Sequence, residues 1–113
     1  MNDRYERQMK KGVFDMLVLK LLESEAKYGY QIIQEMRERS GETFLLKDGT
    51  LYPVLYRLEE EALIAGRWSG TNGRQTSRKY YEITEEGRRA LFELNEVWKR
   101  ISNGVEKIME GDK

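Results

Sequence analysis

The stretch from Asp48 to Ile64, DGTLYPVLYRLEEEALI, constrains the fold more than any other part of the chain. Apolar residues recur in it at intervals of three and four, which predicts a helix with one buried face. Asp48 is a suitable N-cap, and Pro53 so near the helix start costs at most about one internal hydrogen bond. The predicted buried face comprises Leu51, Leu55, Leu58 and Ala62, and the exposed face comprises Gly49, Thr50, Tyr52, Pro53, Tyr56 and Arg57. Such an exposed face needs a partner.

The exposed face of this predicted helix fits two kinds of partner. Its small residues, a hydroxyl and an apolar ring would let the helix start approach base edges in a DNA major groove. Tyrosine hydroxyls and Arg57 would then reach phosphates. Alternatively, Tyr52, Pro53 and Tyr56 cover a neighbouring subunit or loop. The stretch by itself favours neither interpretation.

Positive charge is concentrated directly after this helix. The segment 62–81 contains no acidic residue, whereas Arg67, Arg74, Arg78 and Lys79 supply four positive charges. The whole chain has 20 basic and 20 acidic residues and a formal net charge of +0. The basic segment favours a phosphate partner. The zero net charge of the whole chain counts weakly against nucleic acid, and it implies fewer phosphate contacts and a shallower dependence of binding on salt than a strongly basic protein would show.

The same segment is predicted to form a β-hairpin. Residues 64–68 and 78–83 are rich in strand-forming side chains and flank a loop rich in Gly, Asn and Ser. A two-stranded hairpin is marginally stable alone, so Trp68 and one of Tyr80 and Tyr81 are expected to pack on the helices. The tip is then free to meet a phosphate backbone.

Length and composition limit the classes of function. A chain of 113 residues is expected to form one domain with a small core that oligomerisation would enlarge. It has no cysteine and no histidine, so we expect no disulfide, no metal, no cofactor and no catalytic residue. Glu59, Glu60 and Glu61 point in different directions around a helix, which favours a solvated face over a hydrolytic or Mg²⁺ site. No run approaches the roughly twenty apolar residues of a membrane span, which predicts a cytoplasmic protein without a membrane partner.

The first part of the chain has the order of a DNA-binding domain. Apolar residues at nearly every position of 13–22 predict a helix buried on most sides. A turn at 24–27 leads to a second helix from Tyr28, which Ser40 and Gly41 end as a C-cap, and residues 44–46 bridge to the third. We therefore predict a mostly α fold with a small β-hairpin, in which residues 1–84 form an N-terminal helix and a winged helix-turn-helix.

The segment 85–113 is predicted to be a long C-terminal dimerisation helix. Thr84 is its expected cap, with Glu85 and Glu86 in the first turn, where negative charge is favourable to the helix dipole. Apolar residues then follow the spacing of a heptad seam: Leu91, Leu94, Trp98, Ile101, Val105 and Ile108. A seam of this kind either docks onto its own domain or pairs with a second copy, and its length favours the homodimer.

A homodimer would present two recognition helices to double-stranded DNA. Its two-fold symmetry predicts a pseudo-palindromic operator with half-sites about one DNA turn apart, or a multiple of it. Tyr5, Met9 and Val13, which share a helical spacing near the N-terminus, are suited to lie across the partner's seam.

Four segments of the chain resemble a known family in order and spacing. YGYQII, DGTLYPVLYRLEEE, ALI and RKYYEITEEG are similar to the signature segments of the PadR family of bacterial transcriptional regulators, in its short subgroup with a single C-terminal dimerisation helix. The resemblance covers residues 13 to 113 and implies a homodimeric winged-helix repressor, with residues 50–53 opening the recognition helix and 74–79 in the wing. Ala62 stands where the family usually has glycine, a departure expected only to stiffen the turn into the hairpin.

The resemblance also implies site residues. Tyr28 and Tyr30 stand where the family contacts the DNA backbone, and their place at a helix start agrees with this role. The candidate DNA contacts are Tyr28, Tyr30, Lys47, Gly49, Thr50, Tyr52, Pro53, Arg57, Arg74, Arg78 and Lys79.

Trp98 lies in the middle of the predicted seam, where a two-fold axis would bring it close to its symmetry mate. Two facing indole rings can leave a slot for a small planar aromatic ligand, and the chain is similar here to multidrug-sensing members of the family, in which a tryptophan on this helix stacks on aromatic drugs. A ligand that binds preferentially to a dimer whose two recognition helices are not spaced to match the operator would lower the affinity of the dimer for DNA. The alternative is that Trp98 fills the interface and binds nothing.

A different class of function is also open to a winged helix. Such domains serve as protein docking modules, and a neutral chain with exposed tyrosines suits an adaptor without DNA binding. An adaptor would leave the DNA upstream of its own gene unbound.

Overall fold

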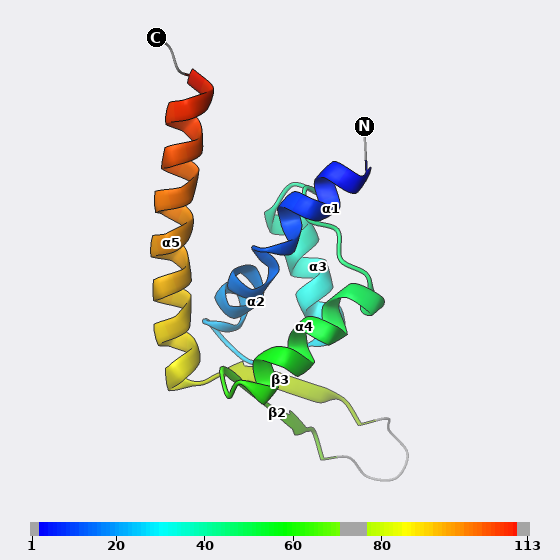
Figure 1. The fold of residues 1–113 in the computed structure, drawn as a ribbon. Coiled ribbons are helices and arrows are strands. Elements are labelled where there is room, and N and C mark those ends of the chain that lie inside the picture. Colours follow the sequence, from blue (N-terminus) through cyan, green and yellow to red (C-terminus); the bar gives the residue numbers. More distant parts are fainter. Residues whose placement is uncertain (1–2, 71–76, 111–113) are drawn as a thin grey trace.

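The described residues, 3–70 and 77–110 of a computed structural model, form a helical domain on a small sheet, with one long helix at its side (Figure 1). The helices are α1 (Asp3–Lys11), α2 (Phe14–Leu22), α3 (Gly29–Arg39), α4 (Asp48–Glu60) and α5 (Glu85–Glu110). The strands are β1 (Lys27–Tyr28), β2 (Ile64–Trp68) and β3 (Lys79–Ile83). This order confirms the mostly α winged helix-turn-helix with a long C-terminal helix.

The sheet has one strand more than the predicted hairpin. β2 and β3, which form the wing, pair antiparallel as expected, with Gly66 opposite Tyr81. β1 pairs with the other edge of β3, which gives the order β1-β3-β2. The prediction of a turn up to Lys27 and a helix from Tyr28 was wrong here, because two extended residues are too few to show an alternating pattern. The third strand stabilises the hairpin and joins the start of α3 to the wing.

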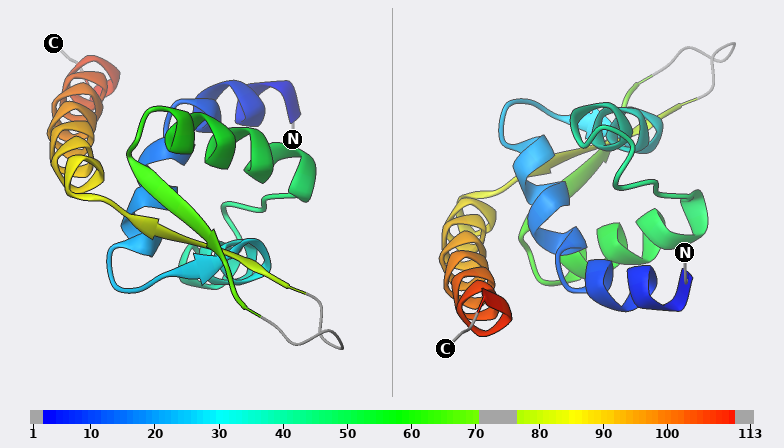
Figure 2. Two further views of the ribbon diagram at one scale, coloured as in Figure 1. Left: turned by 90° about the horizontal axis from the view of Figure 1, so that it is seen from below. Right: turned by 90° about the horizontal axis from the view of Figure 1, so that it is seen from above.

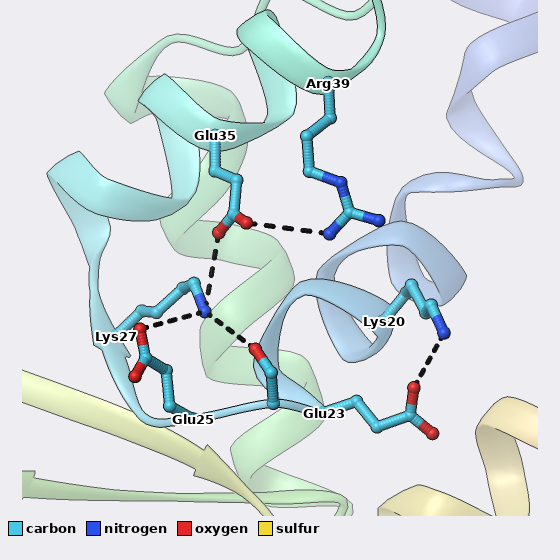
Figure 3. A network of polar contacts seen from close by, with 7 residues as sticks. Lys20, Glu23, Glu25, Lys27, Glu35 and Arg39 are labelled. Carbon is cyan, nitrogen blue, oxygen red and sulfur yellow. Dashed lines mark hydrogen bonds and ion pairs between the residues drawn. The ribbon is translucent and has the colours of Figure 1, made fainter.

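A buried lysine anchors this third strand (Figure 3). Lys27 is 5% exposed, and its Nζ lies 3.4 Å from Oε1 of Glu35 on α3 and 3.9 Å from Oε2 of Glu25. The ammonium also donates a hydrogen bond to Oγ of Ser24 at 3.3 Å. Glu35 is shared with Arg39, whose Nη1 lies 3.6 Å from its Oε2. A buried ammonium is tolerated only with such partners, and this network holds β1 against α3.

The hydrophobic core lies between α2, α3, α4, the start of α5 and the sheet. Leu51, Leu55 and Leu58 of α4 are fully buried, as predicted, and Val54 joins them. The other buried apolar residues are Val18, Leu19, Leu21, Leu22, Ile32, Met36, Leu46, Ile64, Tyr81, Ile83 and Leu91. The core therefore holds α4 by one face and leaves the opposite face on the surface.

Ala62 is exposed, so its predicted place in the core was wrong. It follows the end of α4 and has a φ of 64°, in the left-handed region. The N–H of Leu63 donates to the carbonyl of Leu58, and the N–H of Ala62 donates to that of Glu59, which are the two hydrogen bonds of a Schellman motif. A residue with a Cβ is strained in this conformation, so alanine does more here than stiffen the turn.

Replacing Ala62 by glycine is expected to raise the free energy of unfolding by about 1 kcal/mol, because glycine adopts positive φ without the Cβ penalty. Urea denaturation at one fixed protein concentration measures the difference. Ala65, exposed in β2, is the matched control, since glycine in a strand is expected to destabilise by up to about 1 kcal/mol. A loss of stability in Ala62→Gly would show that the positive φ carries no strain.

Trp68 is 65% exposed, so its predicted packing on the helices was wrong. The other half of the prediction is confirmed, because Tyr81 packs in the core at 1% exposure. Trp68 shares a strand face with Ile64 and Gly66, but the end of β2 runs out past the helices that cover the sheet (Figure 1). The alternation of side chains along β2 therefore predicted correctly which face of the sheet Trp68 lies on. It did not show that the helices no longer cover the sheet at this position.

α5 begins against the domain and ends away from it (Figures 1 and 2). Oγ1 of Thr84 accepts a hydrogen bond from the N–H of Gly87 at 3.0 Å, which confirms Thr84 as the cap. Leu91 is buried and Leu94 half-buried in the core of their own subunit, because the first half of α5 packs against α2. The remaining seam residues, Trp98, Ile101, Val105 and Ile108, are exposed. The predicted seam is thus divided between an internal contact and an open surface.

α1 is tied to the loop that precedes α4. The ammonium of Lys10 donates a hydrogen bond to the carbonyl of Thr43 and lies 5.3 Å from the ring centroid of Phe44. Tyr5 and Met9 remain exposed on α1. The helix is therefore anchored at its C-terminal end and leaves apolar side chains available along its length.

Candidate nucleic-acid interface

The start of α4 presents small side chains on the surface. Lys47 is its N-cap residue, so the predicted cap at Asp48 was one residue too late. The N–H of Thr50 donates to the carbonyl of Lys47 at 2.9 Å, while Asp48 lies in the first turn, where its charge is favourable to the helix dipole. Gly49, Thr50 and Pro53 are all exposed. This end of the helix can approach a flat surface closely.

Tyr52 packs towards α3, so its predicted place on the open face was wrong. Its side chain is half-buried, and a Cβ added at Gly29 would lie 2.3 Å from its hydroxyl oxygen. Gly29, the first residue of α3, therefore leaves the space that this phenol occupies. Tyr56 is exposed, with its ring centroid 6.0 Å from that of Tyr52. Only one of these two tyrosines is thus fully available to a partner.

Two of the predicted phosphate contacts are paired with carboxylates. Nη2 of Arg57 pairs with Oδ1 of Asp15 on α2. Nζ of Lys79 on β3 lies 3.2 Å from Oε1 of Glu59 on α4. Each pair ties α4 to a neighbouring element, and the nearby negative charge weakens the attraction of these cations for phosphate. Arg74, a third predicted contact, lies outside the described residues.

Arg78 joins the wing to the start of α3. Its guanidinium carbon lies 4.4 Å from the ring centroid of Tyr28, and the ring of Tyr80 meets Tyr28 edge-on at 5.3 Å. The N–H of Tyr28 donates a hydrogen bond to Oε1 of Gln31 at 3.0 Å, which fixes it at the helix start. Tyr30 is exposed close by in the sequence. Among the described residues, the guanidinium of Arg78 contacts a ring and not a carboxylate, so its charge can act on an anion.

The pair of Glu59 and Lys79 fills a narrow space between α4 and the wing. A Cβ added at Gly66 would lie 2.5 Å from Cε of Lys79 and 3.0 Å from Oε2 of Glu59. The lysine Nζ also lies 5.3 Å from the ring centroid of Tyr81. Burial raises the pKa of the Tyr81 phenol to about 12, and the charge of Glu59 adds to the shift. Gly66 therefore allows a half-buried ion pair that fixes the wing relative to α4.

This ion pair predicts an unusual sign for one substitution. Glu59→Gln removes a negative charge near the DNA, which would raise the affinity if Lys79 contacted phosphate. If the pair instead positions the wing, Glu59→Gln and Lys79→Gln each lower the affinity for duplex DNA about threefold, and the double variant loses no more than either alone. Fluorescence anisotropy with a labelled duplex measures all three.

The exposed Glu60 provides the control for this experiment. Glu60→Gln also removes one negative charge, at the adjacent residue, and is expected to leave the affinity for duplex DNA unchanged or slightly higher. If Glu59→Gln raised the affinity for duplex DNA as much as Glu60→Gln does, the ion pair would not position the wing. Lys79 would then count again as a phosphate contact.

Sequence and structure comparisons agree on the class of protein. Residues 18–93 match the Transcriptional regulator PadR-like family. The chain belongs to the PadR-like family of transcriptional regulators. It is 36% identical over 101 residues to a Lysinibacillus sphaericus chain called uncharacterized protein X, covering 89% of this chain and 92% of that one. It is also 33% identical over 69 residues to the transcriptional regulator Rv3488 of Mycobacterium tuberculosis, covering 61% and 63% of the two chains.

Solved structures of PadR-like regulators share the fold. A transcriptional regulator from Clostridium thermocellum superposes with a TM-score of 0.82 at 30% identity, over 88% of this chain and 96% of that one. A PadR family regulator from Eggerthella lenta gives a TM-score of 0.82 at 33% identity, over 93% and 88% of the two chains. Members of the family are transcriptional regulators and not enzymes.

In this PadR-like chain, the described candidate DNA contacts other than Arg57 divide into two groups. Tyr28, Tyr52, Arg78 and Lys79 line one groove between α4 and the wing, and Tyr56 lines it with them. The exposed Tyr30, Lys47, Gly49, Thr50 and Pro53 lie outside that groove, at the starts of α3 and α4. Within 3–70 and 77–110, no helix is long and apolar enough to span a membrane, and no cluster of acidic side chains could hold a metal ion.

Some residues of the PadR-like site escaped the sequence analysis. Trp68 lines the groove, and Glu59 pairs with a wing lysine across it. The one local signal was Gly66, since a glycine inside a predicted strand often marks close approach of another group. The identity of that group depends on a contact between segments far apart in the sequence.

Proposed function

We propose that this PadR-like regulator is a homodimer that binds a pseudo-palindromic operator and represses transcription. The observation that carries the dimer is the exposed apolar row on α5: Trp98, Ile101, Val105 and Ile108. α5 leaves the domain along this row, and a second α5 at heptad register would cover it (Figure 1). The exposed Tyr5 and Met9 on α1 are suited to extend the same contact. In this proposal residues 85–113 hold the dimer and residues 1–84 bind DNA.

The DNA-binding surface in this proposal is the start of α4 with the elements beside it. Gly49, Thr50 and Pro53 face base edges in the major groove, because small side chains allow close approach. Phosphate contacts come from Tyr28, Tyr30, Lys47 and Arg78, while Arg57 and Lys79 keep their carboxylate partners. A dimer bound over a promoter blocks transcription by occupying it. Because this action requires access to the chromosome, we propose that the protein acts in the cytoplasm.

A gel-shift titration on the duplex upstream of the protein's own gene tests this proposal. We expect a retained band whose formation weakens with added salt, but less steeply than for a strongly basic protein. The competing adaptor function predicts no retained band at low ionic strength.

The proposal includes release from DNA by a small planar aromatic ligand at Trp98. In support, Trp98 is exposed on α5 within the apolar row, where the partner's indole would face it. Planar cationic dyes are expected to quench Trp98 fluorescence saturably in a Trp68→Phe chain and to weaken the gel-shift band. Quenching that never saturates would leave Trp98 as interface packing only.

A further inference from the structure

A groove of about 340 Å³ separates α4 from the wing. Tyr52 and Tyr56 form its wall on α4, and Trp68 and Arg78 form its wall on the wing. Lys79 and the buried Tyr81 also line it. The groove is open to solvent, and Tyr28 also lines it.

The groove combines exposed aromatic surface with one unneutralised cation. Trp68 is 65% exposed and Tyr56 58% exposed, although a large aromatic side chain gains from burial. Lys79 is neutralised by Glu59 at 3.2 Å, whereas the guanidinium of Arg78 lies 4.4 Å from the ring of Tyr28 and forms no ion pair with a carboxylate among residues 3–70 and 77–110. Among the residues that the structure describes, the groove therefore offers apolar walls and one cation without a carboxylate partner, Arg78.

This chemistry fits the sugar-phosphate backbone of DNA. A deoxyribose has an apolar face that can pack against an aromatic ring, and the neighbouring phosphate attracts a guanidinium strongly. The position also fits, because a strand that passes between a recognition helix in the major groove and a wing beside it must cross this groove. A planar ligand without a negative charge would not use the cation at the rim.

We propose that the groove seats one strand of the duplex, with deoxyribose between the rings of Trp68 and Tyr56 and a phosphate on Arg78. The inference rests on the proposed DNA-binding function. It adds Trp68 as a backbone contact and gives Tyr56, whose hydroxyl was expected to reach a phosphate, a contact with a deoxyribose. Trp68 then has a reason to be exposed at the end of β2. It contributes affinity without reading sequence, since a sugar carries no base information.

Substitution of Trp68 tests the proposed binding of one DNA strand in the groove, called the strand seat below. Two labelled duplexes are used, one from upstream of the protein's own gene and one of scrambled sequence. Trp68→Ala is expected to weaken binding to both about tenfold, without changing the salt dependence, because an apolar contact releases no counterion. Trp68→Phe retains a ring and is expected to recover most of the loss. Arg78→Gln is expected to weaken both duplexes and to reduce the salt slope by about one phosphate contact.

Trp68 fluorescence provides a second readout, in a Trp98→Phe chain whose affinity for the duplex is measured first. Saturation with unlabelled duplex is expected to quench Trp68 and shield it from acrylamide. Wild-type affinity in Trp68→Ala, or loss of binding to the upstream duplex alone, would overturn the strand seat and leave the proposed function intact. Failure of the wild-type protein to bind either duplex would overturn both.

Discussion

Replacing Ile101 by glutamate is expected to separate the dimer into single subunits and to lower the affinity for the operator at least about a hundredfold. Ile101 is exposed on α5 of the isolated subunit, so the glutamate does not disturb the subunit core. In the dimer it would bury an unpaired charge next to its own symmetry copy, which is strongly unfavourable. A single subunit then binds one half-site without the contribution of the other.

Sedimentation velocity measures the oligomeric state, and fluorescence anisotropy with the operator duplex measures the affinity. Asn103→Glu is the matched control, because Asn103 is exposed two residues further along the same helix and outside the predicted seam. That variant is expected to remain dimeric and to bind DNA like the wild type. A dimeric Ile101→Glu protein would place the subunit interface somewhere other than this face of α5.

Replacing Gly87 by alanine is expected to lower the free energy of unfolding by about 3 kcal/mol. A Cβ at Gly87 would lie 2.1 Å from the carbonyl oxygen of Leu63 and 2.7 Å from Cγ1 of Ile83. The nearest of these atoms belongs to the backbone, and the carbonyl of Leu63 also accepts the N–H of Thr84 at 3.1 Å. The first turn of α5 cannot move away without breaking its junction with the wing.

Urea denaturation at a fixed protein concentration measures this effect. Gly104 supplies the control within the same helix, since a Cβ there meets nothing within 4 Å in the subunit. Gly104→Ala is expected to stabilise the protein by up to about 1 kcal/mol through helix propensity. Equal stability of Gly87→Ala and the wild type would mean that α5 does not approach Leu63 so closely in solution.

The parts of the fold that depend on local periodicity could be predicted from the sequence. The buried face of α4, the cap of α5 at Thr84 and the end of α3 at Ser40 each follow from residues within one or two turns. The heptad spacing on α5 was equally visible. Its division between Leu91, which packs in the subunit, and Ile101, which does not, depends on where α2 begins, because α5 passes the start of α2 as it leaves the domain.

The parts that depend on contacts between distant segments could not be predicted. β1 is two residues long and exists because β3 has a free edge beside it. Lys79 and Arg57 looked like phosphate contacts, since composition shows a basic segment and not the carboxylates of Glu59 and Asp15 that pair with them. Trp68 was predicted to pack on the helices because the sequence shows which face of its strand it lies on. The sequence does not show how far along the strand the helices cover that face.

Sequencing of the genomic DNA fragments that the purified protein retains tests the central claim most directly. A two-fold symmetric regulator that places α4 in the major groove predicts enrichment of a pseudo-palindromic motif, with half-sites about one helical turn apart or a multiple of it. The affinity for that motif is expected to exceed the affinity for a scrambled duplex at least about a thousandfold at physiological salt. Retained fragments with the same sequence content as the input would contradict sequence-specific binding by the dimer.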